Sequence, residues 1–288
     1  MAVATQAPTT VSPPRRRERL KSGWVLPVYS ILMIFYLTIP VFLMILYGFN
    51  DLPGNAERQT THFWGFTLHW YLNPFQDPQL TEAFWRSIRI AGGNVLLATP
   101  IGALLGLALG RYWFRVRASL NFVIFLAIAV PEIVLGSSLL TLFIEWSQSP
   151  QLSATAPPLG WRTLLLSHVS FSIPFVAVTV RARVAGMDRS LEEAGQDLFA
   201  TPVVTFFKVT LPLILPGILA GALLAFVLSL DDFVISNFVV GRDITFPLWV
   251  YGATKIGLPP TVNVIGTYLF LTGVILAVVT ALLQRRRV

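Results

Sequence analysis

Three carboxylates stand inside or at the edge of long apolar segments. Glu132 follows Pro131 in one apolar run, and Asp231 and Asp232 lie in the second half of another. A charge within a membrane span costs roughly 3 kcal/mol unless it faces a cavity or a partner. Carboxylates can replace the water around an ammonium group, so we expect Glu132, Asp231 and Asp232 to line a path for a cation. The alternative is structural, with Asp231 and Asp232 capping turns or pairing with Arg242 or a partner subunit.

A second acid-rich stretch lies between two apolar runs. Ser190 and Glu193 have the spacing of a capping box, which predicts a short amphipathic helix. Thr201-Pro202 predicts the start of a second helix. We expect one face of the first helix to be apolar and the other to be in water: the apolar face holds Leu191, Ala194, Gly195, Leu198 and Phe199, and the polar face holds Glu192, Glu193, Gln196 and Asp197.

Other chemistries have no basis in the sequence. The chain has no cysteine, no G-x-x-x-x-G-K-[ST] phosphate loop and no H-E-x-x-H zinc motif. The net charge of +7 comes from short basic clusters at the ends of apolar runs, which favours a membrane protein over a nucleic-acid binder. The lone His168, among serines, is predicted to bond between helices. We therefore expect no catalysis and no cofactor in this chain.

The elements that hold these residues must be membrane helices. The chain is 55% hydrophobic and only 12% charged, with a mean hydropathy of +0.69. A bilayer core of roughly 30 Å needs about 20 helical residues. Backbone amides find no partners in lipid, so the spans should be helices and the fold all-α. Six runs have this length, at residues 26–47, 90–110, 120–144, 164–180, 213–239 and 264–283.

Most of the 21 Lys and Arg residues fall on one side of these spans. The positive-inside rule then places both termini in the cytoplasm. This divides the chain into a disordered basic tail (1–22), a multi-pass membrane domain (23–284) and a short basic tail (285–288). Between the fourth and fifth spans lies a cytoplasmic loop of about 30 residues (181–212), which is too long to lack structure. From these properties alone, the loop is as easily a simple connection as a docking element.

The sequence of this loop resembles a known signature. It is similar to the permease subunits of binding-protein-dependent ABC importers, whose motif is Glu-Ala-Ala, three residues, Gly, nine residues, Ile-x-Leu-Pro. This chain has Glu193-Ala194-Gly195, then Phe199, then Val209-Thr210-Leu211-Pro212, with the same spacing. Phe199 stands where the motif has glycine. The segments around Glu132 and around Asp231-Asp232 resemble the spermidine/putrescine branch of this family.

The resemblance implies a MetI-like type I importer fold with six spans in the bacterial inner membrane. It implies that residues 181–212 form a coupling loop that docks on a separate ATPase. Ser190, Glu192, Glu193, Ala194, Gly195, Asp197, Phe199, Leu211 and Pro212 would belong to that coupling loop. It further implies a second permease subunit, with a heterodimer expected, and an external substrate-binding protein, while ATP and Mg²⁺ would be bound by the ATPase.

Other functions stay open at this point. The same architecture can carry another small solute, such as an opine, an aminophosphonate or a chelated metal. A self-sufficient secondary transporter would need inverted repeats around midplane charges, which the sequence does not show. An intramembrane enzyme would need a convergent catalytic set such as a Ser and His dyad.

Overall fold

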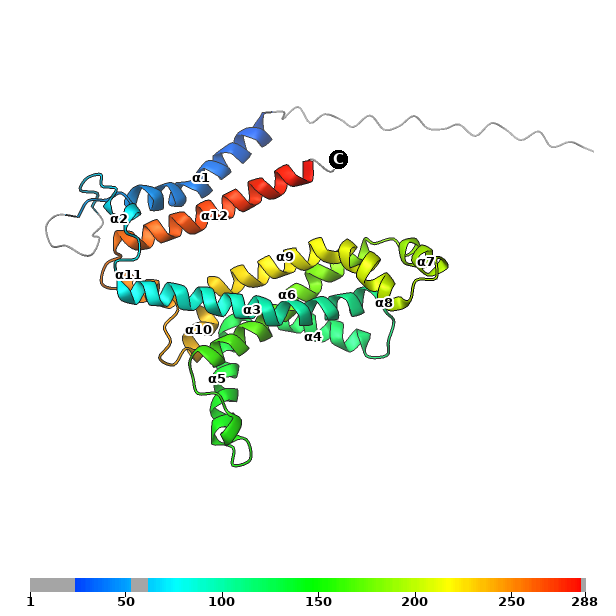
Figure 1. The fold of residues 1–288 in the computed structure, drawn as a ribbon. Coiled ribbons are helices and arrows are strands. Elements are labelled where there is room, and N and C mark those ends of the chain that lie inside the picture. Colours follow the sequence, from blue (N-terminus) through cyan, green and yellow to red (C-terminus); the bar gives the residue numbers. More distant parts are fainter. Residues whose placement is uncertain (1–23, 53–61, 286–288) are drawn as a thin grey trace, which may run out of the picture.

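The computed structural model describes residues 24–52 and 62–285, and this part of the chain is helical. An isolated β-bridge joins Asn50 and Phe66. The predicted all-α fold is confirmed (Figure 1). The helices are α1 (Val25–Tyr47), α2 (His69–Leu72), α3 (Pro78–Arg111), α4 (Arg117–Ala129), α5 (Glu132–Gln148), the 3₁₀ turn η1 (Ser153–Thr155), α6 (Trp161–Ala185), α7 (Ser190–Asp197), α8 (Pro202–Thr205), the π-helix η2 (Phe206–Thr210), α9 (Leu211–Leu230), α10 (Val234–Val239), α11 (Phe246–Thr254) and α12 (Pro260–Arg285).

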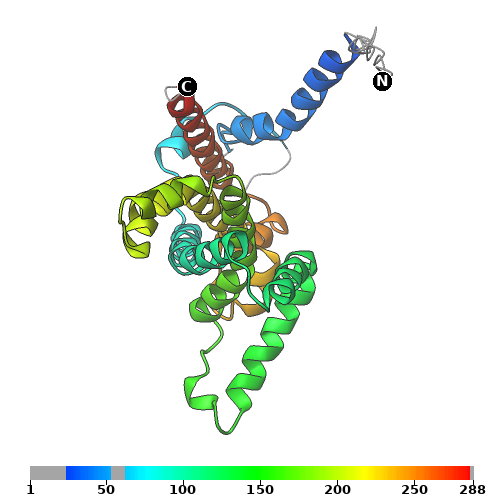
Figure 2. The same ribbon diagram turned by 90° about the vertical axis from the view of Figure 1, so that its right-hand side faces the viewer.

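The core is a bundle of α3, α6 and α9 (Figures 1 and 2). Glycines on α3 let α6 approach closely. A Cβ atom added at Gly102 would lie 2.6 Å from Val176 Cβ, and one added at Gly106 would lie 2.5 Å from the Ala177 carbonyl oxygen. Small residues at such crossings are typical of helices that associate within membranes.

A buried amide joins all three core helices. Asn94 Nδ2 on α3 donates to Ser172 Oγ on α6 and to the Ala225 carbonyl oxygen on α9, both at 2.9 Å. Asn94 and Ser172 are fully buried. Hydrogen bonds between helices in apolar surroundings contribute roughly 0.6–2 kcal/mol each. This contact therefore fixes the register of the bundle next to the polar residues described below.

Helices α1 and α12 form a separate antiparallel pair beside the core (Figure 1). None of the 23 residues of α1 is buried. A helix this apolar and this uncovered must face lipid or another subunit. In Figure 1, the start of α1 and the end of α12 both point toward the side from which α7 projects. The two predicted tails, 1–22 and 285–288, lie almost wholly outside the described residues.

Among the described residues, four helices are long and apolar enough to cross a membrane: α1, α3, α6 and the continuous helix from Pro202 to Leu230. The bent pair α4 and α5 would make a fifth, and α12 has a shorter apolar section, Pro260–Ile275. The chain is therefore a multi-pass membrane protein. The count of six spans stays a prediction.

Two of the predicted spans are broken. The run at 120–144 is not one helix, because α4 and α5 meet at 105° around Val130 and Pro131. Proline has no backbone N–H and forces the preceding residue to be extended, and Val130 has φ −66° and ψ 130°. The run at 213–239 also divides: α9 ends at Leu230, and α10 begins three residues after Asp231.

The coupling loop is shorter than predicted, because its ends belong to helices. Arg181 to Ala185 complete α6, and one continuous helix runs from Pro202 through η2 into α9. Leu211 and Pro212 lie inside that helix. Proline is tolerated there because the π-helical turn before it rearranges the backbone hydrogen bonds. The projecting part, residues 186–201, carries α7 (Figure 1), and we name it the coupling loop after its predicted role.

Candidate functional site

The two helix breaks bring three carboxylates together. Helix α5 packs against α10, where a Cβ atom at Gly136 would lie 2.6 Å from the Phe238 ring. This packing places Glu132, at the start of α5, beside the break between α9 and α10 that holds Asp231 and Asp232. We call Glu132, Asp231 and Asp232 the acidic cluster. The sequence predicted these residues but not the two breaks that bring them together.

Glu132 and Asp231 are the open members of the acidic cluster. Both are exposed, and neither forms an ion pair with a basic residue in the described part of the chain. The predicted alternative of pairing with Arg242 is not seen there. Asp231 caps the carboxyl end of α9, where the helix dipole is also negative. The negative charge of Asp231 is therefore electrostatically unfavourable at this end of α9. A cation that approaches it would relieve this repulsion.

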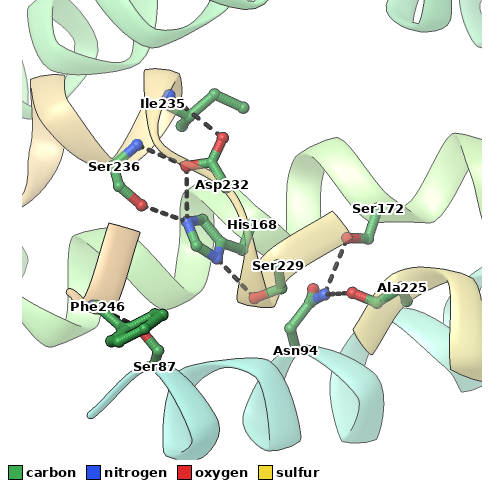
Figure 3. Close-up of polar contacts among 10 residues, drawn as sticks. All are labelled: Ser87, Asn94, His168, Ser172, Ala225, Ser229, Asp232, Ile235, Ser236 and Phe246. Atoms are coloured by element: carbon green, nitrogen blue, oxygen red, sulfur yellow. Dashed lines mark hydrogen bonds and ion pairs between the residues drawn. The ribbon is translucent and has the colours of Figure 1, made fainter. Parts of the chain in front are cut away.

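Asp232 differs from its neighbour. It is 8% exposed, and its carboxylate accepts hydrogen bonds from the backbone N–H groups of Ile235 (3.3 Å) and Ser236 (2.7 Å) in the first turn of α10 (Figure 3). Its Oδ2 also lies 3.3 Å from His168 Nε2. Asp232 thus caps a helix, as the structural alternative for this residue held, and is not an open ligand for a cation.

His168 on α6 links the end of α9 to α10. Its Nδ1 lies 2.6 Å from Ser229 Oγ, and its Nε2 lies 3.0 Å from Ser236 Oγ (Figure 3). The predicted role as a bond between helices is confirmed. Ser, His and Asp side chains meet here, as in a nucleophilic catalyst, but each is at most 8% exposed. A nucleophile must reach its substrate, so this set holds the α9–α10 break in place instead. The 3- and 4-residue spacings of Ser229, Asp232 and Ser236 are the sequence signal that could have identified them as partners of His168.

A cavity of about 500 Å³ lies at the other end of α3 from the coupling loop, between α3 and α6. Arg86 and Arg89 line it together with Asp243 and apolar side chains. Arg86 is paired with Glu82 at 2.5 Å and with Asp243 at 3.5 Å. Since Arg89 adds a further positive charge, this cavity does not favour a cation and is distinct from the acidic cluster.

The start of α7 differs from the predicted capping box. Ser190 is the first helical residue and its side chain makes no capping bond. Instead, the Ser190 backbone N–H donates to Asp188 Oδ1 at 3.0 Å. This bond holds the pKa of Asp188 below its usual range. The second predicted start is confirmed, since Thr201 Oγ1 accepts from the Val204 N–H at 3.4 Å ahead of Pro202.

Glu192 connects the coupling loop to the core. Its Oε2 accepts from Arg111 Nε at 2.9 Å and from the guanidinium NH2 group, and its Oε1 accepts from Thr210 Oγ1 at 2.8 Å. The Arg111 and Glu192 side chains are only 11% and 17% exposed. The prediction that Glu192 lies on a water-exposed face was therefore wrong. No local pattern could reveal a pair 81 residues apart.

The apolar face of α7 points outward rather than into the protein. Leu191 is 46% exposed and Leu198 is 82% exposed, whereas a Cβ atom added at Gly195 would lie 3.6 Å from the Thr205 side chain. Glu193 and Asp197 are exposed, and their side chains bond to no described residue. Ala194 is exposed as well. The helix therefore presents leucines and free acids together, and nothing in the described chain covers them.

Phe199 ends α7 in a left-handed conformation with φ 61°, and no other described non-glycine residue has a positive φ. The N–H groups of Phe199 and Ala200 donate to the carbonyl oxygens of Gln196 (2.9 Å) and Gly195 (3.2 Å), which is a Schellman motif. Such a turn favours glycine, and another residue costs roughly 1–2 kcal/mol. The ring is 97% exposed. The turn thus keeps the geometry that glycine would give, although the residue is phenylalanine.

Comparison with known proteins gives consistent results. The family model of the binding-protein-dependent transport system inner membrane component matches residues 98–288. Among solved structures, a bacterial ABC transporter involved in the import of the acidic polysaccharide alginate superposes with a TM-score of 0.64 at 16% identity, over 92% of this chain and 96% of that one. The MetNI methionine ABC transporter gives a TM-score of 0.52 at 18% identity, over 72% and 95%. These two likenesses support the MetI-like fold.

Relatives in sequence are more similar. The spermidine/putrescine transport system permease protein PotC of Haemophilus influenzae is 35% identical over 93% of this chain and 97% of its own length. PotC of Escherichia coli is 34% identical over 92% and 94%. The putrescine transport system permease protein PotI of Escherichia coli is 34% identical over 86% of both chains. This chain therefore belongs to the binding-protein-dependent transport system inner membrane component family and is a homologue of the PotC and PotI permeases.

Proposed function

We propose that this chain is one of two permease subunits of an ABC importer for polyamines, driven by a separate ATPase. The observation that carries the proposal is the coupling loop. It is held to α3 through Glu192 and Arg111, yet it presents free acids and exposed apolar side chains outward. A loop that only joined two spans would have no reason to combine a firm inner connection with an uncovered apolar face.

The inner connection gives the loop a mechanical role. Movement of α7 would be transmitted to the cytoplasmic end of α3 through Arg111, and to α9 through Thr210 and the continuous helix. Because α3, α6 and α9 pack closely, such a movement would act on the whole core. In this proposal ATP and Mg²⁺ are bound by the ATPase, and the chain itself carries out no chemistry.

The substrate class follows from the acidic cluster. Glu132 and Asp231 are exposed carboxylates without a basic partner in the described chain, so they suit a substrate that carries separated ammonium groups. The names of the PotC and PotI relatives point to spermidine and putrescine. We infer that the substrate passes this cluster after an external binding protein releases it. The uncovered α1 is the surface offered to the second permease subunit.

The experiment is reconstitution of the full complex with its ATPase and binding protein, followed by measurement of polyamine-stimulated ATP hydrolysis and uptake. Glu132→Gln should lower uptake about tenfold or more, since an ammonium group of the substrate loses its charged partner. The complex should still assemble. Glu145→Gln is the matched control, because Glu145 is an exposed glutamate on the same helix, α5, at the end away from the cluster. If no ATPase copurifies with the permease, the proposal fails.

Competition separates the remaining substrates. Unlabelled spermidine and putrescine should abolish uptake of labelled polyamine, whereas an opine, an aminophosphonate or a chelated metal should not. Stimulation of hydrolysis by one of those solutes instead would keep the importer and overturn the polyamine assignment.

A further inference from the structure

Phe199 combines two unfavourable features at one position. Its backbone adopts a conformation that disfavours side chains, and its ring is 97% exposed to water. Glycine would relieve both, with the same Schellman turn. Within the described chain nothing compensates for either feature, because no contact of the Phe199 ring with another aromatic or basic side chain is found there. Compensation has to come from outside the described residues.

The surroundings of Phe199 define what could cover it. Leu198 beside it is 82% exposed, and Val203 on α8 is 65% exposed, so the ring is the most exposed part of an apolar tip. Glu193 and Asp197 flank this tip with free negative charges. An anionic lipid surface would repel those acids. A protein pocket with an apolar floor and basic side chains at its rim would accept both the ring and the acids.

We propose that Phe199 is the anchor residue of the coupling loop, and that its ring inserts into an apolar pocket with a basic rim on the ATPase subunit. This rests on the proposed function, since it assumes that an ATPase docks on the loop. It goes further in naming the residue and the chemistry of the partner's pocket. The ring at this left-handed turn is 97% exposed, and its burial in the complex compensates for the backbone strain of the free subunit.

The test uses substitutions that separate strain from docking. Phe199→Gly removes the strain and the ring, and Phe199→Asn removes the ring while tolerating the turn. Both should raise the thermal unfolding temperature of the isolated permease. Both should also weaken its binding to the copurifying ATPase by about tenfold or more, as loss of a buried aromatic anchor does. Phe199→Trp should keep binding within about threefold.

The opposite signs of these two effects decide the matter. If Phe199 only shaped the turn, glycine would stabilise the permease and leave ATPase binding unchanged or tighter, and this result would overturn the proposal. A parent permease that binds no ATPase at all would instead overturn the proposed function. The two failures are therefore distinguishable.

A photo-crosslinking amino acid at position 199 identifies the occupant directly. In the assembled complex in membranes, it should capture the ATPase subunit, and adding excess free ATPase to ATPase-stripped membranes should restore that product. The same probe at Phe122, an exposed aromatic residue on α4, is the control and should not capture the ATPase. Capture of lipid or of the second permease at position 199 would contradict the assignment.

Discussion

The acidic cluster and the coupling loop each contain two neighbouring acids, and in each pair one acid is bonded and the other is free. Asp232 and Glu192 are bonded, while Asp231 and Glu193 are exposed. The difference lies in the bonding partner. Arg111 at the end of α3 supplies a cation for Glu192, whereas the described chain supplies none for Glu132 or Asp231. A cation from outside therefore suits the cluster, and a protein surface suits the loop.

The largest expected effect tests the inner connection of the loop. Glu192→Ala leaves the largely buried Arg111 guanidinium without its carboxylate, so the free energy of unfolding should fall by about 3 kcal/mol. Chemical denaturation of the purified permease would measure it. Glu193→Ala next to it removes no bond within the described chain and should change stability by less than about 0.5 kcal/mol. Equal losses from the two variants would remove the distinction between the acids.

The same contrast can be tested in the acidic cluster. Asp232→Ala removes two backbone caps and the contact with His168, and should lower the free energy of unfolding by about 2 kcal/mol. Asp231→Ala should cost little, because Asp231 is exposed at the end of α9. Thermal unfolding of both variants in one detergent gives the comparison. A larger loss of stability in Asp231→Ala than in Asp232→Ala would mean that Asp231, and not Asp232, is the structural residue.

For polyamine uptake, in contrast to stability, Asp231 should matter more than Asp232. Asp231→Asn should reduce polyamine uptake by the reconstituted complex about tenfold while stability is kept, since an ammonium group loses a charged partner. Combining it with Glu132→Gln should reduce uptake further than either change alone. Unchanged uptake in the double variant would show that the substrate does not pass the cluster.

The smallest effect concerns the first turn of α7. The folded pKa of Asp188 is lowered by the Ser190 N–H, so the stabilisation from this cap is present above the unfolded pKa and is lost as the pH falls through the folded value. Protection of the Ser190 amide against hydrogen exchange should therefore decrease below about pH 4. Asp188→Ala should abolish that pH dependence. A pH response that persists in Asp188→Ala would assign the cap to another group.

Much of the fold was predictable because lipid imposes simple rules. Apolar length located the helices, and the motif spacing located the loop and Phe199. The breaks were missed because hydropathy measures composition rather than chain direction, so the run that contains Val130 and Pro131 was predicted as one span. A proline followed by an acid within a span is the signal that could have revealed this break.

The sequence identified the residues of the candidate sites but did not distinguish the roles of neighbouring residues. Asp231 and Asp232 are identical in sequence terms, and only the geometry after α9 gives Asp232 two N–H donors. Glu192 was predicted to lie on the water-exposed face of its helix because that prediction used only the polarity and spacing of neighbouring residues. Its actual partner, Arg111, lies on α3 and is far from Glu192 in the sequence. Long-range pairing of this kind leaves no trace in local spacing.

The role of the coupling loop is tested most directly by the ratio of polyamine uptake to ATP hydrolysis in the reconstituted complex carrying Glu193→Ala. We expect a stable permease, an assembled complex and continued basal hydrolysis, with uptake per ATP reduced at least about tenfold, because a free acid of the docking surface is lost. Uptake and hydrolysis coupled as in the parent complex would contradict the claim that this loop joins the membrane path to the ATPase.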